Sequence, residues 1–387
     1  MLPIAIALCF ILVVPYLIYI ILTRVIDPWA SPAQKPIAAD SEPEPVSIVL
    51  PTYNESQIIK NTLERLCSLS YPASKLEIVV VDSSSDGTAD IVRSFFAERP
   101  DGTGPTLTLL EEDDRGGVAR AVNLAIEAAS HDIIFRTDCD SRLGDDVLEH
   151  AVANLQDPAV GAVTGRQTEV LGQSKVEENY RDIQAKNQAL ESHLDSTFIV
   201  HGPCFAFRRE YFQPISTDSL ADDTEIAVNI RKQGKRVVMD PEMRFAEVGV
   251  SDIRGRRQRK DRRAMGLLQL LGRHRDLLGR YGWYGRFVIP FNWFFLAISP
   301  WLLTAFLATV FLTLFLVLGP IGIVGPVALG IFIALGNWDL LGPLQPFYVV
   351  FDSQISLAIA SVRLLSGDDD GTWELDADSR DVFERES

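Results

Sequence analysis

Two short apolar runs in this chain end in carboxylates, and this pattern constrains the fold more than any other feature. The run 77–81 is followed by Asp82, and the run 132–137 by Asp138 and Asp140. Each run is typical of a buried parallel strand, and open α/β sheets bind ligands at the carboxyl ends of such strands. Two acids one residue apart also suit a divalent cation with hard oxygen ligands. The pattern therefore predicts an α/β sheet with an acidic crevice.

Strand and helix patterns alternate from residue 46 to residue 137. Strands are expected at 46–51, 76–81, 107–110 and 133–137, with helices between them that end near Leu69, Ala97 and Ala129. This rhythm favours a mostly parallel, Rossmann-like sheet with right-handed crossovers and flanking helices. No Gly-x-Gly-x-x-Gly sequence follows the first strand and no Walker loop is present, so dinucleotide-binding and P-loop folds lose support.

The apolar residues are concentrated at the two ends of the chain. The net charge is −16, yet the mean hydropathy is +0.11. The run 3–22 is uncharged and long enough to cross a bilayer, and it lacks the basic leader of a signal peptide. The uncharged stretch 287–338 has room for two spans that turn at Gly319 and Pro320. The stretch 340–365 carries Asp352 and is expected either to lie on the membrane or to cross it.

These segments predict a layout for the whole chain. We expect an N-terminal transmembrane helix at 1–23, a linker at 24–45, an α/β domain at 46–263, basic juxtamembrane helices at 264–298, a transmembrane hairpin at 299–338, an interfacial or third C-terminal membrane segment at 339–365, and an acidic tail at 366–387. The four cysteines lack pair spacing, so neither a disulfide framework nor a zinc site is indicated, which fits a reducing cytoplasm.

Charge is unevenly distributed and predicts how the chain lies in a cell membrane. A basic cluster at 254–286 directly precedes the uncharged stretch. Such clusters lie on the cytoplasmic side and contact anionic lipid head groups, so we expect a multi-pass protein whose α/β domain is cytoplasmic. Nucleic acid is not an expected partner, because 52 acidic residues outnumber 36 basic ones. That acidic bias resembles proteins of salt-loving archaea and indicates a strongly solvated surface.

Six short motifs follow one another through the α/β domain. They lie at 50–55, 80–88, 117–123, 138–140, 200–208 and 222–225. In this order they resemble the family 2 glycosyltransferases, inverting enzymes with a GT-A fold. The membrane-bound branch with the cellulose, hyaluronan and chitin-like synthases is similar in having C-terminal spans, and the tail 371–374 looks like its end signature. The resemblance implies a glycosyltransferase that uses a nucleotide-sugar donor.

The resemblance also implies which residues bind the nucleotide. Thr52, Tyr53 and Glu55 would line the nucleoside pocket, and Asp82 would hydrogen-bond the base. Glu55 and Asp82 have an alternative role as caps of the following helices, where acids are favoured. Asn123 would contact the nucleotide or, alternatively, serve the structure of its helix.

Three arginines are candidates for contact with the diphosphate. The family's usual lysine corresponds here to a valine, so Arg115 or Arg120 would supply the missing positive charge. Arg262 matches the arginine with which the family binds the diphosphate.

Asp138 and Asp140 are the expected metal pair. Asp140 would be the primary ligand, and Asp138 its partner, which touches the ribose or a metal-bound water. Alternation along an extended chain would point both side chains the same way. Mg²⁺ or Mn²⁺ would then neutralise the departing diphosphate. A solvated acidic turn without function is the alternative.

Asp223 is the expected catalytic base. It would remove a proton from the acceptor hydroxyl as that oxygen attacks opposite the diphosphate, which inverts the anomeric carbon. Asp222 beside it would orient the base, and the like charges of the two neighbours would raise the pKa within the pair. Helix capping is the alternative for both acids. The resemblance places Gly202 and Arg259 in the acceptor region.

One departure from the family pattern bears on the product. The family's diphosphate motif ends in a tryptophan that stacks on the acceptor sugar, and Arg263 stands there in this chain. We therefore expect transfer of one sugar, from a UDP-sugar, to a lipid-linked acceptor. A processive polysaccharide synthase and a polyprenyl-phosphate sugar synthase remain as alternatives. A transporter would need more spans, and a non-catalytic binding module would be expected to lose one of the acids.

Overall fold

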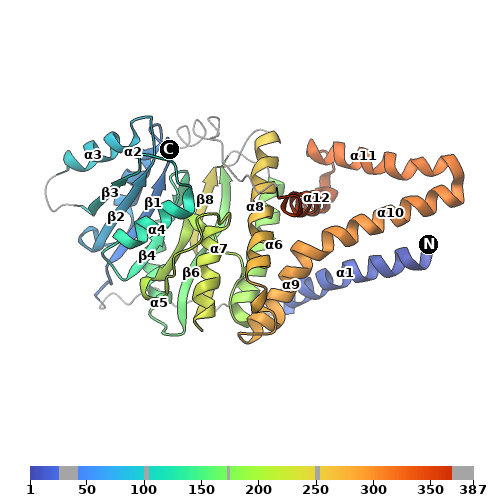
Figure 1. The fold of residues 1–387 in the computed structure, drawn as a ribbon, viewed down its shortest axis with the longest axis horizontal. Helices are drawn as coiled ribbons and strands as arrows, with labels where there is room; N and C mark the ends of the chain where they lie inside the picture. The colour runs from blue at the N-terminus through green and yellow to red at the C-terminus, as the bar shows by residue number, and fades with distance from the viewer. Residues whose placement is uncertain (26–41, 100–103, 172–174, 249–252, 368–387) are drawn as a thin grey trace.

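The computed structural model describes residues 1–25, 42–99, 104–171, 175–248 and 253–367. A sheet flanked by helices forms one end of the molecule, and long apolar helices form the other end (Figure 1). Most of the expected linker and the C-terminal motif at 371–374 lie outside the described residues.

One eight-stranded sheet forms the centre of the α/β domain, in the order β3-β2-β1-β4-β7-β6-β8-β5. Its strands are β1 (Val46–Thr52), β2 (Leu76–Asp82), β3 (Thr106–Glu111), β4 (Ile133–Arg136), β5 (Ser141–Leu143), β6 (Val160–Leu171), β7 (Phe205–Arg208) and β8 (Arg236–Val248). The half from β3 to β4 is parallel, as expected. Beyond β4 the sheet is mixed: β7 is antiparallel to β4 and β6, and β5 to β8, whereas β6 and β8 are parallel.

The register of the parallel half brings the expected site residues to one edge. Thr52 at the end of β1 lies beside Asp82 at the end of β2. Strand β4 ends earlier, with Arg136 level with Val49. The chain therefore leaves β4 below the level of Thr52 and Asp82, and Asp138 follows shortly after this end.

Helices cover both faces of the sheet. They are α2 (Ile59–Ser68), α3 (Thr88–Ala97), α4 (Val118–Ala128), α5 (Val147–Leu155), α6 (Lys175–Leu194), α7 (Asp222–Lys232) and α8 (Ile253–Arg273). Alternate residues of β1 face opposite sides: Ile48 packs in the core with α2, α3 and α5, whereas Val49 packs in the core with α4 and α7. Helices α6 and α8 stand between the sheet and the apolar end (Figure 1).

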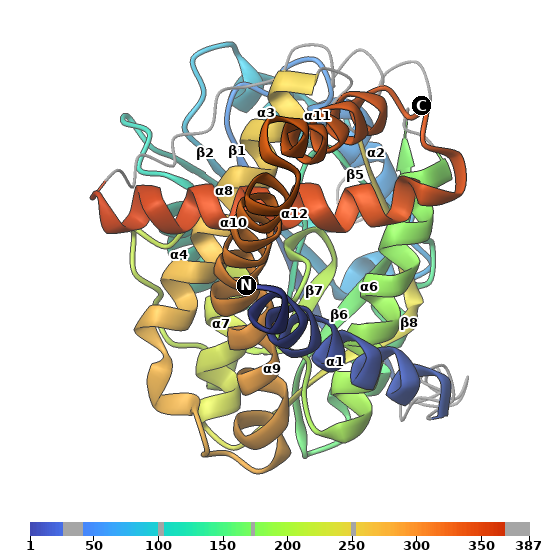
Figure 2. The same ribbon diagram turned by 90° about the vertical axis from the view of Figure 1, so that its right-hand side faces the viewer.

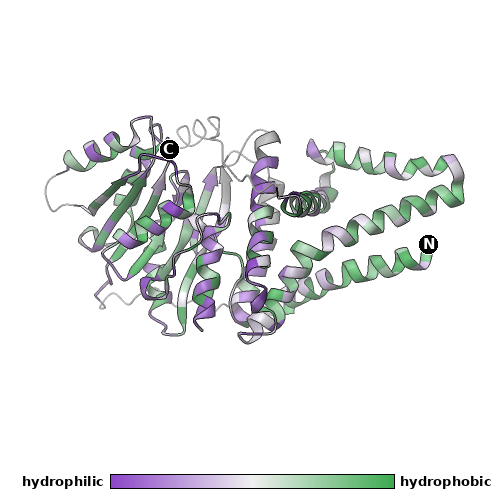
Figure 3. Cartoon of the chain, viewed as in Figure 1, coloured by the Kyte–Doolittle hydropathy of each residue, from purple (hydrophilic) through white to green (hydrophobic). Residues whose placement is uncertain are grey.

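The apolar end is built from α1 (Leu2–Val25), α9 (Ile289–Trp293), α10 (Ser299–Leu318), α11 (Val324–Asn337) and α12 (Gln345–Leu365). In the part of the chain that the structure describes, three stretches are long and apolar enough to cross a membrane: Leu2–Val25, Tyr284–Asn337 and Gly342–Leu365. Helix α1 lies along α10, and the chain turns between α10 and α11 at Gly319, whose φ is +59°. Hydrophobic residues dominate this end in Figure 3.

Helix α12 differs from the other apolar helices in direction. It runs across the ends of α10 and α11, as the end-on view in Figure 2 shows. It packs against α8, where Asp352 pairs with Arg257 at 2.7 Å and with Lys260 at 2.8 Å. The one acidic side chain of α12 is thus directed at the α/β domain.

The first helix is tied to the α/β domain by a buried carboxylate on α6. Glu191 Oε1 accepts hydrogen bonds from Tyr19 Oη at 3.1 Å and from Asn292 Nδ2 at 2.8 Å. Glu191 Oε2 also accepts the backbone N–H of Phe198 at 2.9 Å. Since α1, α6 and α9 meet at this one group, the position of the apolar end is coupled to the α/β domain.

Candidate active site

Asp82 lies at the edge of the sheet and is tied to its neighbouring strand. Its Oδ1 accepts hydrogen bonds from Thr52 Oγ1 at 2.6 Å and from Ser84 Oγ at 2.5 Å. Asp82 does not cap the next helix, because Asp86 accepts the N–H of Thr88 there. The capping alternative is thus wrong for Asp82, whose carboxylate is instead fixed beside Thr52 at the carboxyl end of β2.

Tyr53 and Glu55 follow Thr52 in the loop after β1. The guanidinium of Arg115 lies 3.9 Å from the centroid of the Tyr53 ring. Arg120, the other candidate for the missing positive charge, pairs with Glu112 at 2.8 Å. The contact with Tyr53 places Arg115 at the expected nucleoside pocket. Glu55 is buried, and its backbone N–H donates to a threonine hydroxyl at the start of α3.

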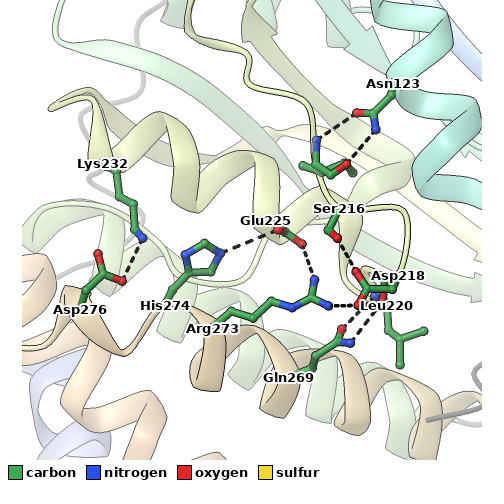
Figure 4. A network of polar contacts seen from close by, with 11 residues as sticks. Asn123, Ser216, Asp218, Leu220, Glu225, Lys232, Gln269, Arg273, His274 and Asp276 are labelled. Carbon is green, nitrogen blue, oxygen red and sulfur yellow. Dashed lines mark hydrogen bonds and ion pairs between the residues drawn. The ribbon is translucent and has the colours of Figure 1, made fainter.

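Asn123 has structural contacts. Its Nδ2 donates to the carbonyl of Ile215 at 2.8 Å, and its Oδ1 accepts the N–H of Ile215 at 3.0 Å. Figure 4 shows the two bonds side by side. Both ends of the amide thus bind the backbone of one residue, so the contacts of Asn123 are structural. We therefore leave Asn123 out of the nucleotide site.

Asp138 and Asp140 lie on a turn after β4, where Ser141 N donates to the carbonyl of Asp138 at 3.3 Å. The expected alternation along an extended chain was therefore the wrong reason for placing the two acids together. The turn rests on α2, because Thr62 Oγ1 donates to the carbonyl of Cys139 at 2.7 Å. Burial, reinforced by the charge of Asp138, raises the pKa of Asp140 to about 7.

The donor set at this turn fits a hard divalent cation. Both acids offer carboxylate oxygens, and a cation would offset the burial and the charge of Asp138 that together raise the pKa of Asp140. Within the described residues, no group of three or more His, Cys, Asp or Glu side chains could hold a metal. A cation here would need further ligands from a bound diphosphate or water, which is how Mg²⁺ is usually held.

Asp222 and Asp223 form the first turn of α7. Asp223 Oδ2 accepts the N–H of Gly202 at 2.8 Å, and its Oδ1 accepts the N–H of Thr224 at 2.6 Å. Burial and the charge of Asp222 raise the pKa of Asp223. The bond to Thr224 lies at the helix start, so Asp223 is held by the helix backbone while its carboxylate contacts Gly202.

Arg136 joins the two groups of acids, and our sequence analysis missed it. Its Nη2 lies 3.3 Å from Asp138 Oδ1 and 3.1 Å from Asp222 Oδ2. It is almost fully buried at the end of β4. The signal that could have found it is an arginine inside an otherwise apolar strand, since arginine is rarely buried without a partner.

Glu247, at the end of β8, is a second carboxylate that the sequence analysis missed. Its Oε2 accepts a hydrogen bond from Gln167 Nε2 at 3.1 Å and pairs with Arg263 at 3.2 Å. Burial alone would raise its pKa, but Arg263, Arg181 and Arg259 lower the pKa of Glu247 to about 2. No motif pointed to this residue.

Helix α8 brings two further predicted arginines to the acids. Burial lowers the pKa of Arg262, while the charges of Asp222 and Asp138 act in the opposite direction. The charge of Arg259 opposes the rise that burial and Asp138 cause in the pKa of Asp140. Both guanidinium groups therefore lie within electrostatic range of the expected metal and base acids.

The loop before α7 is held between α4 and α8 (Figure 4). Gln269 of α8 accepts from the N–H of Leu220 and donates to the carbonyl of Asp218, at 3.3 and 3.2 Å. Arg273 pairs with Asp218 at 2.5 Å and with Glu225 at 3.4 Å. Since this loop leads directly into Asp222, its anchors fix where α7 begins.

Comparison with known proteins shows which families and structures this chain is similar to. Residues 47–215 match the family model "Glycosyl transferase family 2", and residues 133–328 match "Glycosyl transferase family group 2". The chain is 30% identical to the solved mannosyltransferase PcManGT from Pyrobaculum calidifontis, in complex with GDP-Man and Mn²⁺. That match covers 94% of this chain and 98% of the other, with a TM-score of 0.75.

Curated relatives match over a shorter part. The poly-β-1,6-N-acetyl-D-glucosamine synthase of Staphylococcus aureus (strain COL) is 26% identical over 218 residues, which are 54% of this chain and 51% of that protein. The synthase of the same name from Staphylococcus epidermidis is 26% identical over 193 residues, 48% of this chain and 45% of that protein. The chain thus spans about half the length of the curated relatives it matches.

Proposed function

Because this chain belongs to glycosyltransferase family 2 and has the GT-A fold, we propose that it transfers one sugar from a nucleotide sugar to a lipid-linked acceptor at a membrane surface. The observation that carries the proposal is that Arg136 at the end of β4 pairs with both Asp138 and Asp222, while Asp82 ends the neighbouring parallel strand beside Thr52, in a chain with apolar helices on both sides of the α/β domain. The family, the fold and the enzyme class expected from the sequence are confirmed.

GDP-mannose is the donor that we propose first. Its support is the likeness over nearly the whole chain to a mannosyltransferase solved with GDP-Man and Mn²⁺. This replaces the UDP-sugar expected from the sequence as the leading candidate. In the proposed site, Thr52, Tyr53 and Glu55 line the nucleoside pocket, and Asp82 holds the base.

Asp138 and Asp140 are the proposed ligands of Mn²⁺ or Mg²⁺. When bound, the cation would neutralise charge on the departing diphosphate. Arg262 and Arg115 would contribute further positive charge, Arg262 from α8 and Arg115 from its place over Tyr53. The metal ion and the two arginines would together balance the negative charge of the donor's diphosphate.

Asp223 is the proposed base. The N–H groups of Gly202 and Thr224 each bind one of its oxygens, so the carboxylate keeps one orientation while its other lone pairs can accept a proton. Burial and Asp222 raise its pKa, which strengthens it as a proton acceptor. It would take the proton of the acceptor hydroxyl as that oxygen attacks the anomeric carbon. The attack comes from the face opposite the diphosphate, so the configuration inverts.

The contacts of Arg263 and α12 support a single transfer at the membrane. Arg263 is paired with Glu247, so the position where polymerising relatives carry a stacking tryptophan holds an ion pair instead. Asp352 of α12 is paired with α8 and stays outside hydrocarbon if α12 lies at the cytoplasmic surface. We propose that α1, α10 and α11 cross the membrane and that the α/β domain faces the cytoplasm.

A processive polysaccharide synthase is the second candidate. It is favoured by the similarity of this chain to two curated polysaccharide synthases, over about half of the length of each. Product length separates the two functions. A single transfer yields a lipid that carries one added sugar, whereas a synthase yields a ladder of longer products.

The test uses membranes from cells that express the full chain. They are incubated with radiolabelled GDP-mannose or UDP-sugars, with Mn²⁺ or with a chelator, and the lipid phase is extracted. We expect label in the lipid phase that requires GDP-mannose and Mn²⁺ and is lost in Asp223→Asn. Transfer from a UDP-sugar alone would overturn the donor, and the absence of transfer from any nucleotide sugar would refute the function.

A further inference from the structure

Arg136 is a buried arginine at the centre of the site to which the proposed function gives no role. It is the last residue of β4, and only 5% of its surface is exposed. A buried charge is costly unless partners surround it. Its partners come from two separate parts of the crevice.

One nitrogen of Arg136 contacts both groups of acids. Nη2 lies 3.3 Å from Asp138 Oδ1, on the turn that we assign to the donor. The same atom lies 3.1 Å from Asp222 Oδ2, at the start of α7 beside the proposed base. The guanidinium therefore spans the donor half and the base half of the site.

The other nitrogen of Arg136 lies against Gly202. A Cβ atom at Gly202 would lie 1.4 Å from Arg136 Nη1, so no larger residue fits while the guanidinium holds this place. The N–H of Gly202 donates to Asp223 Oδ2 at 2.8 Å. The backbone that holds the base thus packs directly on the guanidinium that holds Asp138 and Asp222.

We propose that Arg136 is a positioning residue that joins Asp138 to the pair Asp222–Asp223 and so fixes the distance between the leaving group and the base. This inference rests on the proposed function. A guanidinium suits this role because it is planar and more weakly hydrated than an ammonium, so it is favoured in buried ion pairs over the point charge of a lysine on its flexible stem. Without the guanidinium of Arg136, the carboxylates of Asp138, Asp222 and Asp223 repel one another, and the contact from β4 that holds the first turn of α7 in place is lost.

Substitutions at Arg136 test the inference. We expect kcat to fall about tenfold in Arg136→Lys and about 10²-fold in Arg136→Met, because a misplacement of about 1 Å can cost that much. The KM for the donor and the Kd of GDP with Mn²⁺, measured by calorimetry, should change less than about threefold, because a positioning residue acts after binding. Arg244→Met is the matched control: this exposed arginine pairs only with Glu242 among the described residues, so its kcat should equal that of the wild type.

Two further measurements separate positioning from a merely structural role. Guanidinium ion at millimolar concentration should restore part of kcat in Arg136→Ala, and methylammonium should restore less, because it lacks the planar, weakly hydrated group. In a double-mutant cycle, the loss from Arg136→Lys or Arg136→Met should nearly vanish in the Asp223→Asn background, where no base remains to be positioned. If thermal melting shows that Arg136→Met does not fold, the double-mutant cycle uses Arg136→Lys only.

Several outcomes would overturn the inference. If Arg136→Met has the kcat of the wild type, Arg136 has no positioning role. If the variant affects only the KM for the donor or the affinity for GDP, Arg136 is a donor-binding residue. A full loss that persists in the Asp223→Asn background would mean that Arg136 acts independently of the base. If the wild-type chain transfers no sugar, the proposed function and this inference fall together. Wild-type transfer with an unaffected Arg136→Met refutes the inference alone.

Discussion

Replacing Asp223 by asparagine should slow turnover sharply while the protein stays folded. The amide cannot accept the proton that the carboxylate takes, and a positioned general base contributes about 10²-fold or more to the rate. A loss of 10² corresponds to about 2.7 kcal/mol of transition-state stabilisation. The KM for the donor should change little, because Asp223 contacts Gly202 and Thr224 rather than the nucleotide pocket.

Two opposing effects on stability follow from the contacts of Asp223. Both of its oxygens accept backbone N–H groups, whereas asparagine has one acceptor oxygen, so one donor faces an NH₂ group at a cost of about 1–3 kcal/mol. In the other direction, the pKa of Asp223 is raised on folding. Its ionised form therefore destabilises the fold above the folded-state pKa, and this cost vanishes below the unfolded-state pKa. Asparagine removes that cost, so we expect a small net change in the melting temperature at neutral pH.

The pH dependence of kcat gives an independent check. The base must be ionised, so kcat should fall as the pH drops through the raised pKa of Asp223. Removing the neighbouring charge in Asp222→Asn should move this limb to lower pH, because that charge helps to raise the pKa. Steady-state kinetics on purified protein measure both. If Asp223→Asn binds the donor poorly but turns over normally at saturation, or if Asp222→Asn leaves the limb in place, the assignment of the base is wrong.

Three further predictions address the metal site, the loop anchor and the topology. Asp140→Asn should weaken Mn²⁺-dependent GDP binding by at least about tenfold, since mutation of residues that merely support a metal ligand already costs that much. Unchanged GDP binding in calorimetry would exclude Asp140 as a ligand of the metal. Asn123→Ala should lose about 1–3 kcal/mol of stability with an unchanged donor KM, since both of its bonds hold Ile215; a raised KM would return it to the nucleotide site. In intact cells, an impermeant maleimide should fail to label Ser366→Cys on a cysteine-free background and should label it after permeabilisation. Labelling without permeabilisation would mean that α12 crosses the membrane.

The sequence by itself determined the parts that depend on local pattern. Apolar runs of strand length predicted β1, β2 and β4 within a residue or two of their observed ends, and the runs of β2 and β4 lead into acids. In a parallel sheet those ends meet at one edge, so the neighbourhood of Thr52 and Asp82 followed without knowledge of the fold. Long uncharged runs likewise predicted apolar helices, because hydropathy and length are properties of the segment alone.

Tertiary structure decided the roles that depend on partners far along the chain. Arg136 binds Asp222 because an antiparallel β7 beside β4 brings Gly202 and the start of α7 over the end of β4, and no periodicity encodes that strand order. The sequence suited Asn123 to a nucleotide contact or to a role in its helix, and only the fold brings Ile215 against its amide. The direction of α12 depends on α8, whose basic side chains hold Asp352. A polar side chain takes its role from the group that satisfies its hydrogen bonds and charge, and in these cases only folding brings that group near.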